Sequence, residues 1–404
     1  MSKDNQTNGG TSAPLKDGKI LWVNTLFLTI TPVLAIVLGS WHLYAGKTNF
    51  THIVAFFATW WMTGLGITMG YHRLFSHRSY NAPKVVQAIL AFFGGGSIEN
   101  SAIVWSAGHR YHHRDVDTEG DPYNAQRGFL YSHILWIMRE GPRHNALDNV
   151  DDLFANPITA FQHKHYLKLT VLFNIGVPLS MGLITGDYIG MLLWAGLIRL
   201  VAVHHGTFCI NSVTHMFGKR PYSSLTSARD NWLFSLITFG EGYHNYHHAF
   251  QTDYRNGPRW FNFDPGKWLI WSLSKVGLAS GLRRIPDEMI IRKRLQERRY
   301  IFDGQKERLE EAIRNRLQGA EQTIAQWREE FNHRVKTADL NIDREIAKLR
   351  LRRKQLAVAT SAKKKELKRE FVAARASLKR SYQEWEASLE DALNNFSCQV
   401  APAT

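Results

Sequence analysis

The stretch IVAFFATWWMTGLGITMGYHRLFSHRSY (residues 53–80) joins a long apolar run directly to a histidine-rich segment. A helix needs about 20 mainly apolar residues to cross the hydrocarbon core of a bilayer, and residues 53–71 satisfy that requirement. His72 and His77 follow at once and carry imidazoles, which bind transition metals. The sequence therefore predicts a transmembrane helix with metal-binding side chains just past its end.

Three further stretches are apolar enough to span a membrane, namely residues 20–44, 166–185 and 188–210. Residues 46–50 and residues 186–187 form short connections, so the four predicted spans pair into two helical hairpins. We expect an all-α integral membrane protein in which a cytosolic helical cap carries a histidine-rich site for two metal ions. A long C-terminal helix or coiled coil completes the predicted fold.

The distribution of basic residues predicts the orientation of these spans. Lysine and arginine precede the first span and follow the second and fourth, whereas the two short connections contain only Lys47. The positive-inside tendency then places both termini and the histidine-rich site on the cytosolic side. Residues 1–19 lack the apolar core of a signal peptide, and we expect a disordered lead-in there, followed by a membrane domain over residues 20–286.

Three apolar stretches are too short or too interrupted to be spans: residues 85–93, 232–239 and 268–278. Their length and composition favour helices that lie in the membrane interface. For the first of them, a buried helix in the cytosolic part is an equally good interpretation.

The chain carries a net charge of +15, and much of its charge lies in residues 287–404. Residues 287–400 contain no proline, and their apolar residues recur at steps of three and four, which predicts a long helix or coiled coil and a candidate surface for homo-oligomerisation. We interpret the charge mainly as a solvated face, with contact between residues 363–368 and anionic lipid as the sharper alternative. No catalytic motif and no nucleic-acid partner are expected there. The seam comprises Ile313, Leu317, Ala320, Ile324, Trp327, Phe331, Val335, Ala338, Ile342, Ile346 and Leu349.

Nine histidines fall into patterned groups. Two copies of HxxHH place imidazoles at positions i, i+3 and i+4, on one face of a helix, and an HxxxxH pair and one histidine after the fourth span add three more. Neutral imidazole suits iron, copper, zinc and nickel, and nine ligands are too many for one ion but suit two. The candidate ligands are His72, His77, His109, His112, His113, His215, His244, His247 and His248.

Other histidines are isolated, and we do not expect them to bind metal: His42, His52, His133, His144, His163, His165 and His333. His204 and His205 lie inside the fourth predicted span, where ionisable residues are functional candidates, although we do not favour them as ligands. The two cysteines, Cys209 and Cys398, form no CxxC pair and predict neither a disulfide framework nor a thiolate metal site.

Four segments together resemble the membrane fatty acyl desaturases of the stearoyl-CoA delta-9 type. They are GYHRLFSHRSY (residues 70–80), GHRYHHRDVDTEGDPYNAQRGF (residues 108–129), NSVTHMFGKRPY (residues 211–222) and GEGYHNYHHAFQTDYR (residues 240–255). The similarity covers roughly residues 21–286, so the tail that follows inherits no role from it.

The resemblance implies a set of site residues. The nine histidines would hold two iron ions, and Asn211 would contact the metal through water. Trp105 and Thr207 match positions that line the bend of an acyl tunnel, and Arg139 matches part of a basic site for a thioester headgroup. Glu140 departs from the animal enzymes, in which a basic residue is expected at this position.

The resemblance also implies an activity, namely O2-dependent insertion of a cis double bond, delta-9 in type, into a saturated acyl chain carried as acyl-CoA or acyl-lipid. Unactivated methylenes have no useful acidity, so we expect the metal centre to supply the oxidant and no catalytic residue beyond its ligands. No fused haem or iron–sulfur motif is evident in the sequence, so electrons would come from a separate ferredoxin, rubredoxin or cytochrome b5 type protein. Asp115, Asp117, Glu119 and Asp121 are candidates to orient imidazoles, or simply a polar loop.

Three other functions compete with this one. A membrane di-iron hydroxylase of lipids or alkanes would use the same ligands and yield an alcohol. A metal-storing or scaffold protein would have the coiled coil as its main function. A haem cytochrome would need paired histidines within spans, which only His204 and His205 supply.

Overall fold

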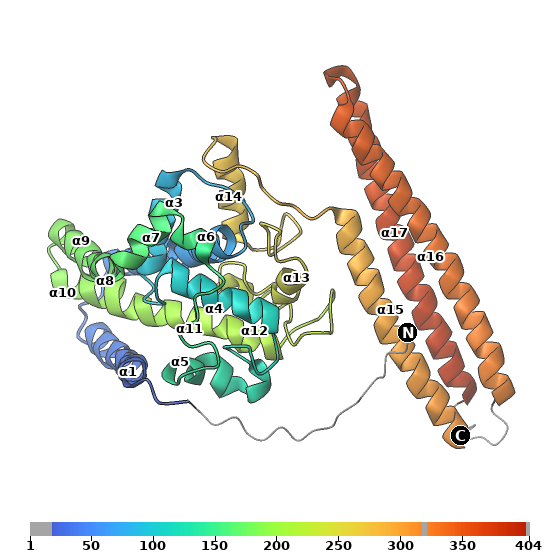
Figure 1. Cartoon of the computed structure of the whole chain (residues 1–404), viewed down its shortest axis with the longest axis horizontal. Helices are drawn as coiled ribbons and strands as arrows, with labels where there is room; N and C mark the ends of the chain where they lie inside the picture. Colours follow the sequence, from blue (N-terminus) through green and yellow to red (C-terminus); the bar gives the residue numbers. More distant parts are fainter. Residues whose placement is uncertain (1–17, 317–320, 401–404) are drawn as a thin grey trace. The chain divides into compact units, whose positions relative to one another are not determined.

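A computed structural model describes residues 18–316 and 321–400 of the chain (Figure 1). Among these residues the regular structure is helical, and β-pairing is limited to isolated bridges such as Ile20 with Arg139. The chain divides into two compact units, one ending at Arg284 and the other, here called the tail, formed mainly by the chain from Ile285 onward.

Four helices are long and apolar enough to cross a membrane, which confirms the all-α, four-span fold. The first is α1 (Trp22–Tyr44), and the second joins α2 (Phe50–Leu65) to the π-helix η1 (Gly66–Ser76). The third span runs over Tyr166–Thr185 and the fourth over Tyr188–Met216. Their segments are α8 (Tyr166–Val171), η4 (Leu172–Gly176), α9 (Val177–Thr185), α10 (Tyr188–Met191), η5 (Leu192–Ile198), α11 (Arg199–Asn211) and α12 (Val213–Met216).

Tight turns close both hairpins at the end of the bundle away from the histidine motifs. Gly46 and Gly186 adopt φ values of +66° and +78°, a left-handed conformation that glycine tolerates without strain. Asn49 caps α2, and Asp187 caps α10 by accepting the backbone N–H of Gly190. His52 Nε2 lies 2.9 Å from Asp187 Oδ2, so a hydrogen bond joins the two hairpins here.

Two spans continue further than the hydropathy pattern predicted. The second helix runs to Ser76 and the fourth to Met216, so His72 and His215 lie inside the final turns and not just past the helix ends. The apolar core of a bilayer needs only about 20 residues, so a helix of this length extends roughly 10 Å beyond it. Hydropathy did not predict these polar last turns, because it detects residues that suit the lipid core and does not show whether the helix continues beyond it.

The shorter apolar segments have three different outcomes. Residues 85–93 lie in α3 (Lys84–Gly95), which buries Val86 and Leu90 against η1. Residues 268–278 correspond to α14 (Pro265–Lys275). The prediction of a helix over residues 232–239 was wrong, because only the 3-10 turn η6 (Phe234–Leu236) forms there.

Left-handed backbone ends this segment. Phe239 and Gly240 adopt φ values of 54° and 98°, which end any helix at this point. The turn directs the Phe239 ring onto the second span, 4.7 Å from the Trp60 ring and 5.4 Å from the Trp61 ring. Phe239 therefore packs against a helix, whereas Trp232, Leu233, Leu236 and Ile237 are exposed.

Shorter helices carry the rest of the first unit between and after the spans. They are α4 (Ala102–Asp115), η2 (Ala125–Arg127), η3 (Tyr131–Leu135), α5 (Trp136–Met138), α6 (Asp151–Phe154), α7 (Pro157–Lys164) and α13 (His244–Ala249). α4 contacts η1 and α3, and α14 contacts η1. The main apolar cluster of the unit lies where η1, α3 and α4 meet.

The tail folds as three helices, α15 (Asp287–Arg316), α16 (Glu321–Val358) and α17 (Ser361–Val400), and not as one long rod. Figure 1 shows α16 and α17 running side by side with α15 beside them. The predicted seam is buried from Ile324 to Leu349, with Ala338 partly buried, and it packs against Leu378, Trp385 and Leu389. Leu317 and Ala320 lie outside the described residues. The seam finds its partners within the chain.

Candidate metal centre

Two helices present the HxxHH motifs. α4 carries His109, His112 and His113, and its N-terminus is capped by Ser101, whose Oγ accepts the backbone N–H of Val104. α13 is only six residues long and carries His244, His247 and His248. Asp230 steadies it by accepting the backbone N–H of Tyr246 at 2.9 Å.

The HxxxxH motif depends on the π-helix in which it lies. In an α-helix, side chains five residues apart point about 140° away from each other. In η1 the backbone N–H of His77 donates to the carbonyl of His72 at 3.0 Å, the i to i+5 bond of a π-helix. The wider turn brings the two rings to one side, with centroids 4.8 Å apart.

All nine candidate histidines converge into two groups of imidazoles, in each of which the potential ligand atoms lie within 4.8 Å of one another. The first histidine group contains His72, His77, His109, His113 and His247. The second histidine group contains His112, His215, His244 and His248. Each group draws on at least three separate segments of the chain, so the fold, and not local sequence, assembles it.

The spacing of the ring nitrogens fits ions held between them. Nε2 atoms of neighbouring rings lie 2.8 Å apart for His77 and His109, 3.0 Å for His72 and His247, and 3.0 Å for His244 and His215. Two nitrogens bound at about 2.0–2.1 Å to one ion at right angles are roughly 2.9 Å apart. The donor set, nitrogen without thiolate, suits iron, copper, zinc or nickel.

Acidic and hydroxyl partners orient several imidazoles from behind. His112 Nδ1 lies 2.9 Å from Asp121 Oδ1, and His215 Nδ1 lies 2.7 Å from Ser227 Oγ, which in turn hydrogen-bonds Asp117. A partner at Nδ1 fixes the tautomer and points the Nε2 lone pair toward the metal position. Of the other two carboxylates considered from sequence, Asp115 pairs with Arg114 and Arg143, and exposed Glu119 contacts no histidine.

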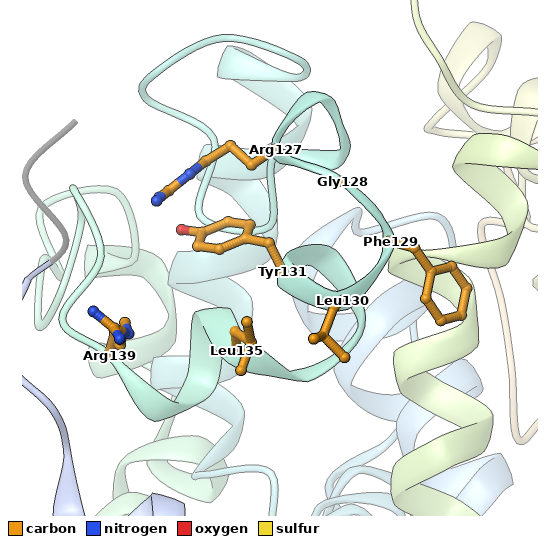
Figure 2. Close-up of a pocket in the computed structure, with 7 residues that line it drawn as sticks. All are labelled: Arg127, Gly128, Phe129, Leu130, Tyr131, Leu135 and Arg139. Carbon is orange, nitrogen blue, oxygen red and sulfur yellow. The ribbon is translucent and has the colours of Figure 1, made fainter. Parts of the chain in front are cut away.

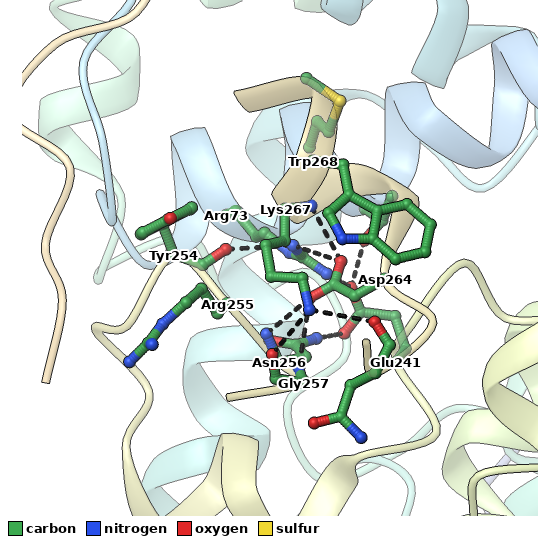
Figure 3. A network of polar contacts seen from close by, with 12 residues as sticks. Arg73, Glu241, Tyr254, Arg255, Asn256, Gly257, Asp264, Lys267 and Trp268 are labelled. Carbon is green, nitrogen blue, oxygen red and sulfur yellow. Dashed lines mark hydrogen bonds and ion pairs between the residues drawn. The ribbon is translucent and has the colours of Figure 1, made fainter. Parts of the chain in front are cut away.

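Glu241 is an orienting residue that sequence reasoning missed. Its Oε2 lies 3.1 Å from His72 Nδ1, and its Oε1 accepts from Arg73 at 3.2 Å and also from Thr68. Arg73 pairs in addition with buried Asp264 at 2.9 Å (Figure 3). Its place in GEGYH, three residues before His244, was the only available signal, because the contact joins residues far apart in sequence.

Lys267 completes this buried network (Figure 3). Its ammonium donates to the carbonyls of Gly257, Arg259 and Asn262 at 2.8–3.0 Å. Burial lowers the pKa of Lys267 to about 8, although Asp264 opposes the shift. The network fixes the loop after α13 against η1, and thereby the carboxylate behind His72.

Burial and mutual repulsion favour the neutral form of most of these imidazoles. Loss of solvent, followed by the neighbouring imidazoles, holds the pKa values of His77, His109 and His113 well below 6.5. The same causes act on the three histidines of α13. Burial opposes ionisation of Glu241, but His72 and Arg73 outweigh it and lower its pKa to about 2. Neutral rings and ionised carboxylates are the states that metal ligation needs.

Trp105 and Thr207, the two expected tunnel residues, meet next to the first histidine group. The Trp105 ring stacks on His109 with centroids 4.9 Å apart. Glu99 joins the two residues, accepting from Trp105 Nε1 at 3.1 Å and from Thr207 Oγ1 at 2.9 Å. Burial raises the pKa of Glu99 to about 7 despite these hydrogen bonds. Glu99 was not singled out from the sequence.

Arg139 lies in a different place, in a surface pocket of about 400 Å³ that also contains Arg127, Leu130, Tyr131 and Leu135 (Figure 2). The Arg127 guanidinium lies 3.7 Å from the centre of the Tyr131 ring. Asn211 ends α11, half-buried and one helical turn before His215.

Several of the other histidines have partners outside the two histidine groups. His204 Nε2 contacts the carbonyl of Ser97 at 2.7 Å, and His205 Nδ1 contacts His133 Nε2 at 3.1 Å. His42, His52 and Asp187 form a third group at the opposite end of the bundle. There the backbone N–H of Asn49 donates to His52 Nδ1, so Nε2 carries the proton toward Asp187 and presents no lone pair to a metal.

Two groups of convergent imidazoles in a helical membrane protein are compatible with a metal site, and they define the class of membrane proteins with clustered histidine ligands. The fatty acid desaturase family model matches residues 48–264, slightly more than half of the 404 residues. The chain belongs to the fatty acid desaturase family.

Individual relatives agree with the family. The chain is 45% identical over 243 residues to a probable acyl-CoA desaturase of Schizosaccharomyces pombe, which covers 60% of this chain and 51% of the relative. It is 36% identical over 280 residues to stearoyl-CoA desaturase 5 of Bos taurus, with coverage of 67% and 82%. It is 34% identical over 272 residues to the sn-1 stearoyl-lipid 9-desaturase of Anabaena variabilis, with coverage of 66% and 94%. The chain thus spans about half the length of the yeast relative and most of the other two.

Proposed function

We propose that this protein is an O2-dependent fatty acyl desaturase that inserts a cis double bond, delta-9 in type, into a saturated acyl chain. The two histidine groups would each hold one iron ion, with Asn211 contacting the metal through water. The observation that carries the proposal is the convergence of nine imidazoles from four segments into two adjacent groups beside Trp105 and Thr207.

When bound, the iron pair supplies the oxidising power that removes hydrogen from unactivated methylenes, which no side-chain acid or base can do. The protein's own residues supply position. Trp105 stacks against His109 and is tied through Glu99 to Thr207, so the three form a rigid wall beside the first histidine group. An acyl chain bent against this wall would present one carbon pair to the metals and keep water away from them.

The acyl carrier and the electron source are separate parts of the proposal. The relatives include proteins named for acyl-CoA and for acyl-lipid substrates, so either carrier is compatible with family membership. Arg139 and Arg127 in the surface pocket would contact an anionic headgroup. Electrons would come from a separate ferredoxin, rubredoxin or cytochrome b5 type protein.

The proposed topology places the site and both termini on the cytosolic side, within reach of a soluble electron donor. The basic residues that follow the second and fourth spans support this orientation. Homo-oligomerisation through the tail would have to use a face other than the seam, because α16 and α17 bury the seam against each other.

Mass spectrometry of lipids tests the activity directly. We expect expression in a host that lacks unsaturated fatty acids to yield acyl chains lighter by two mass units, with the double bond at carbon nine. Supplying labelled stearoyl-CoA or labelled stearoyl-lipid to membranes containing the protein would identify the carrier. A product heavier by one oxygen would instead identify a hydroxylase.

His109→Ala provides the matched inactive variant, because this side chain belongs to the first histidine group. His144→Ala is its control, since His144 is exposed and lies outside both groups. We expect product from the control and none from His109→Ala, with both proteins eluting as folded monodisperse species. Equal product from the two variants would contradict the proposed site.

A further inference from the structure

The charge of the tail is distributed very unevenly. Residues 344–380 contain 14 lysines and arginines and only three acidic residues. The remaining residues from 285 to 404 contain 12 basic and 16 acidic residues. The first of these segments covers the end of α16, the turn at residues 359–360 and the first half of α17.

The structure gathers this charge at one end of the bundle. Arg353 pairs with Glu288 and Arg375 with Asp287 at 2.8 Å, so α15 begins beside the middle of this segment. Beyond that level, α16 and α17 continue as a two-helix hairpin that projects past α15 (Figure 1). We call residues 354–369 the hairpin tip.

Basic residues of the hairpin tip have no acidic partners. Just outside the hairpin tip, Arg352 pairs with Glu370 at 2.9 Å and Lys348 pairs with Glu345 at 2.6 Å. At the tip, six exposed cations form no ion pair with any described residue: Lys354, Lys363, Lys364, Lys365, Lys368 and Arg369. A solvated face of a helical bundle ordinarily intersperses both signs of charge, as the rest of this tail does.

The apex of the tip exposes one large apolar side chain. Val358, the last residue of α16, is 86% exposed, although valine is usually buried. It lies between Lys354 and the three lysines that begin α17. The carbonyl of Thr360 accepts the backbone N–H groups of Lys363 and Lys364, both at 3.1 Å, and this fixes the tight turn. An apolar apex surrounded by cations matches the interface between lipid headgroups and acyl chains.

We propose that the hairpin tip binds the anionic surface of a phospholipid membrane. The tail is covalently continuous with a unit that lies in a bilayer, so such a surface is always at high local concentration. Lysines near an anionic leaflet each contribute about 1 kcal/mol, so the six unpaired cations suffice for binding. Nucleic acid would engage the charge but leaves the exposed Val358 without a partner.

Vesicle sedimentation with the full-length protein tests this assignment. The protein is reconstituted into nanodiscs of phosphatidylcholine alone and mixed with vesicles of phosphatidylcholine, with or without phosphatidylserine. We expect it to sediment only with the serine-containing vesicles, and to be released by high salt because surface charges are screened. Failure to sediment with them would overturn the proposal.

A pair of charge-matched variants locates the contact. Lys364→Glu with Lys365→Glu reverses two tip charges, and glutamate near the first turn of α17 is compatible with the helix. Arg308→Glu with Lys336→Glu reverses two exposed charges away from the tip. We expect the tip variant to bind vesicles at least about tenfold more weakly and the control to bind as the wild type does. Equal losses in both would overturn the assignment to the tip.

A fluorescent label distinguishes lipid from other polyanions. With Cys209 and Cys398 replaced, an environment-sensitive dye at Val358→Cys should shift to the blue when phosphatidylserine is added to the protein's own bilayer. Single-stranded RNA added to phosphatidylcholine discs should cause no shift. A tip-dependent response to RNA without a response to lipid would contradict the proposal.

Discussion

The two units of this protein bury different kinds of side chain, and a pair of arginines shows the difference. Arg73 pairs with Asp264 at 2.9 Å with both side chains almost fully buried, whereas Arg292 of the tail pairs with Asp343 at 3.2 Å with both exposed. The first unit surrounds its site with buried charges, while the tail packs an apolar seam and leaves the cations of its ion pairs exposed. Arginine–carboxylate ion pairs therefore have different roles in the two units. In the first unit they position the residues behind the imidazoles, and in the tail they lie on the surface of the helical bundle.

The same substitution at these two arginines should have the most unequal effects. Arg73→Met removes the guanidinium that pairs with the buried carboxylates of Glu241 and Asp264, and we expect the first unit to lose about 3–5 kcal/mol of stability. Arg292→Met should change the stability of the tail by less than about 1 kcal/mol, because exposed pairs contribute little. Thermal unfolding in detergent, monitored by size-exclusion chromatography, measures the stability change of both variants. Similar losses would remove the distinction between the units.

A cavity at the tail seam should destabilise the tail without affecting the candidate metal centre of the first unit. Trp385 is buried against Phe302 and donates to Asp339 Oδ1 at 3.1 Å. We expect Trp385→Ala to lower the free energy of unfolding of the tail by about 3–5 kcal/mol. The helical circular dichroism signal of the variant should then be lost at a lower temperature than that of the wild type. Val372→Ala, at an exposed position, is the control. Loss of bound iron in Trp385→Ala would show that the units are not independent.

Removing one carboxylate behind an imidazole should weaken metal binding without unfolding the protein. Asp121→Asn removes the charge that orients His112, and such changes typically cost about 10–100-fold in metal affinity. Asp115→Asn is the matched control, since Asp115 contacts Arg114 and Arg143 and no histidine. Competition with a chelator gives the two affinities. Equal affinities would exclude an orienting role for Asp121.

Replacing Glu99 should leave the metal centre in place and change only the pH dependence of stability. Burial raises its pKa from 4.5 to about 7, so folding favours the protonated acid. The wild type should therefore lose stability as pH rises from about 4.5 to about 7 and then level off, whereas Glu99→Gln, which cannot titrate, should lack this decline. Melting temperatures across this range measure it. Parallel curves for the two proteins would contradict the shifted pKa.

Much of the architecture was accessible from composition and spacing. The spans follow from apolar runs, and residues 166–185 were predicted with the ends that the structure has. HxxHH also worked well, because i, i+3 and i+4 share a face in any α-helix. The length of an apolar run and the spacing of side chains on a helix face depend only on neighbouring residues, so the sequence shows them directly.

The remainder depends on contacts between distant segments. The π-helical continuation through His72 cannot be read from hydropathy, and Glu241 acquires its role only when the loop before α13 packs on η1. The apolar side chains of residues 232–239 predicted an interfacial helix, but only a 3-10 turn forms there. The tail seam was recognised and offered as a candidate surface for homo-oligomerisation, whereas the structure packs it against α17 of the same chain.

Iron content is the measurement that tests the central claim most directly. Plasma mass spectrometry of the full-length protein, purified after growth with iron, should find about two iron ions per chain, and His247→Ala should hold markedly less while remaining folded and losing all desaturation product. A wild-type protein that desaturates its substrate with no bound iron, or a His247→Ala variant with unchanged iron and product, would contradict the account.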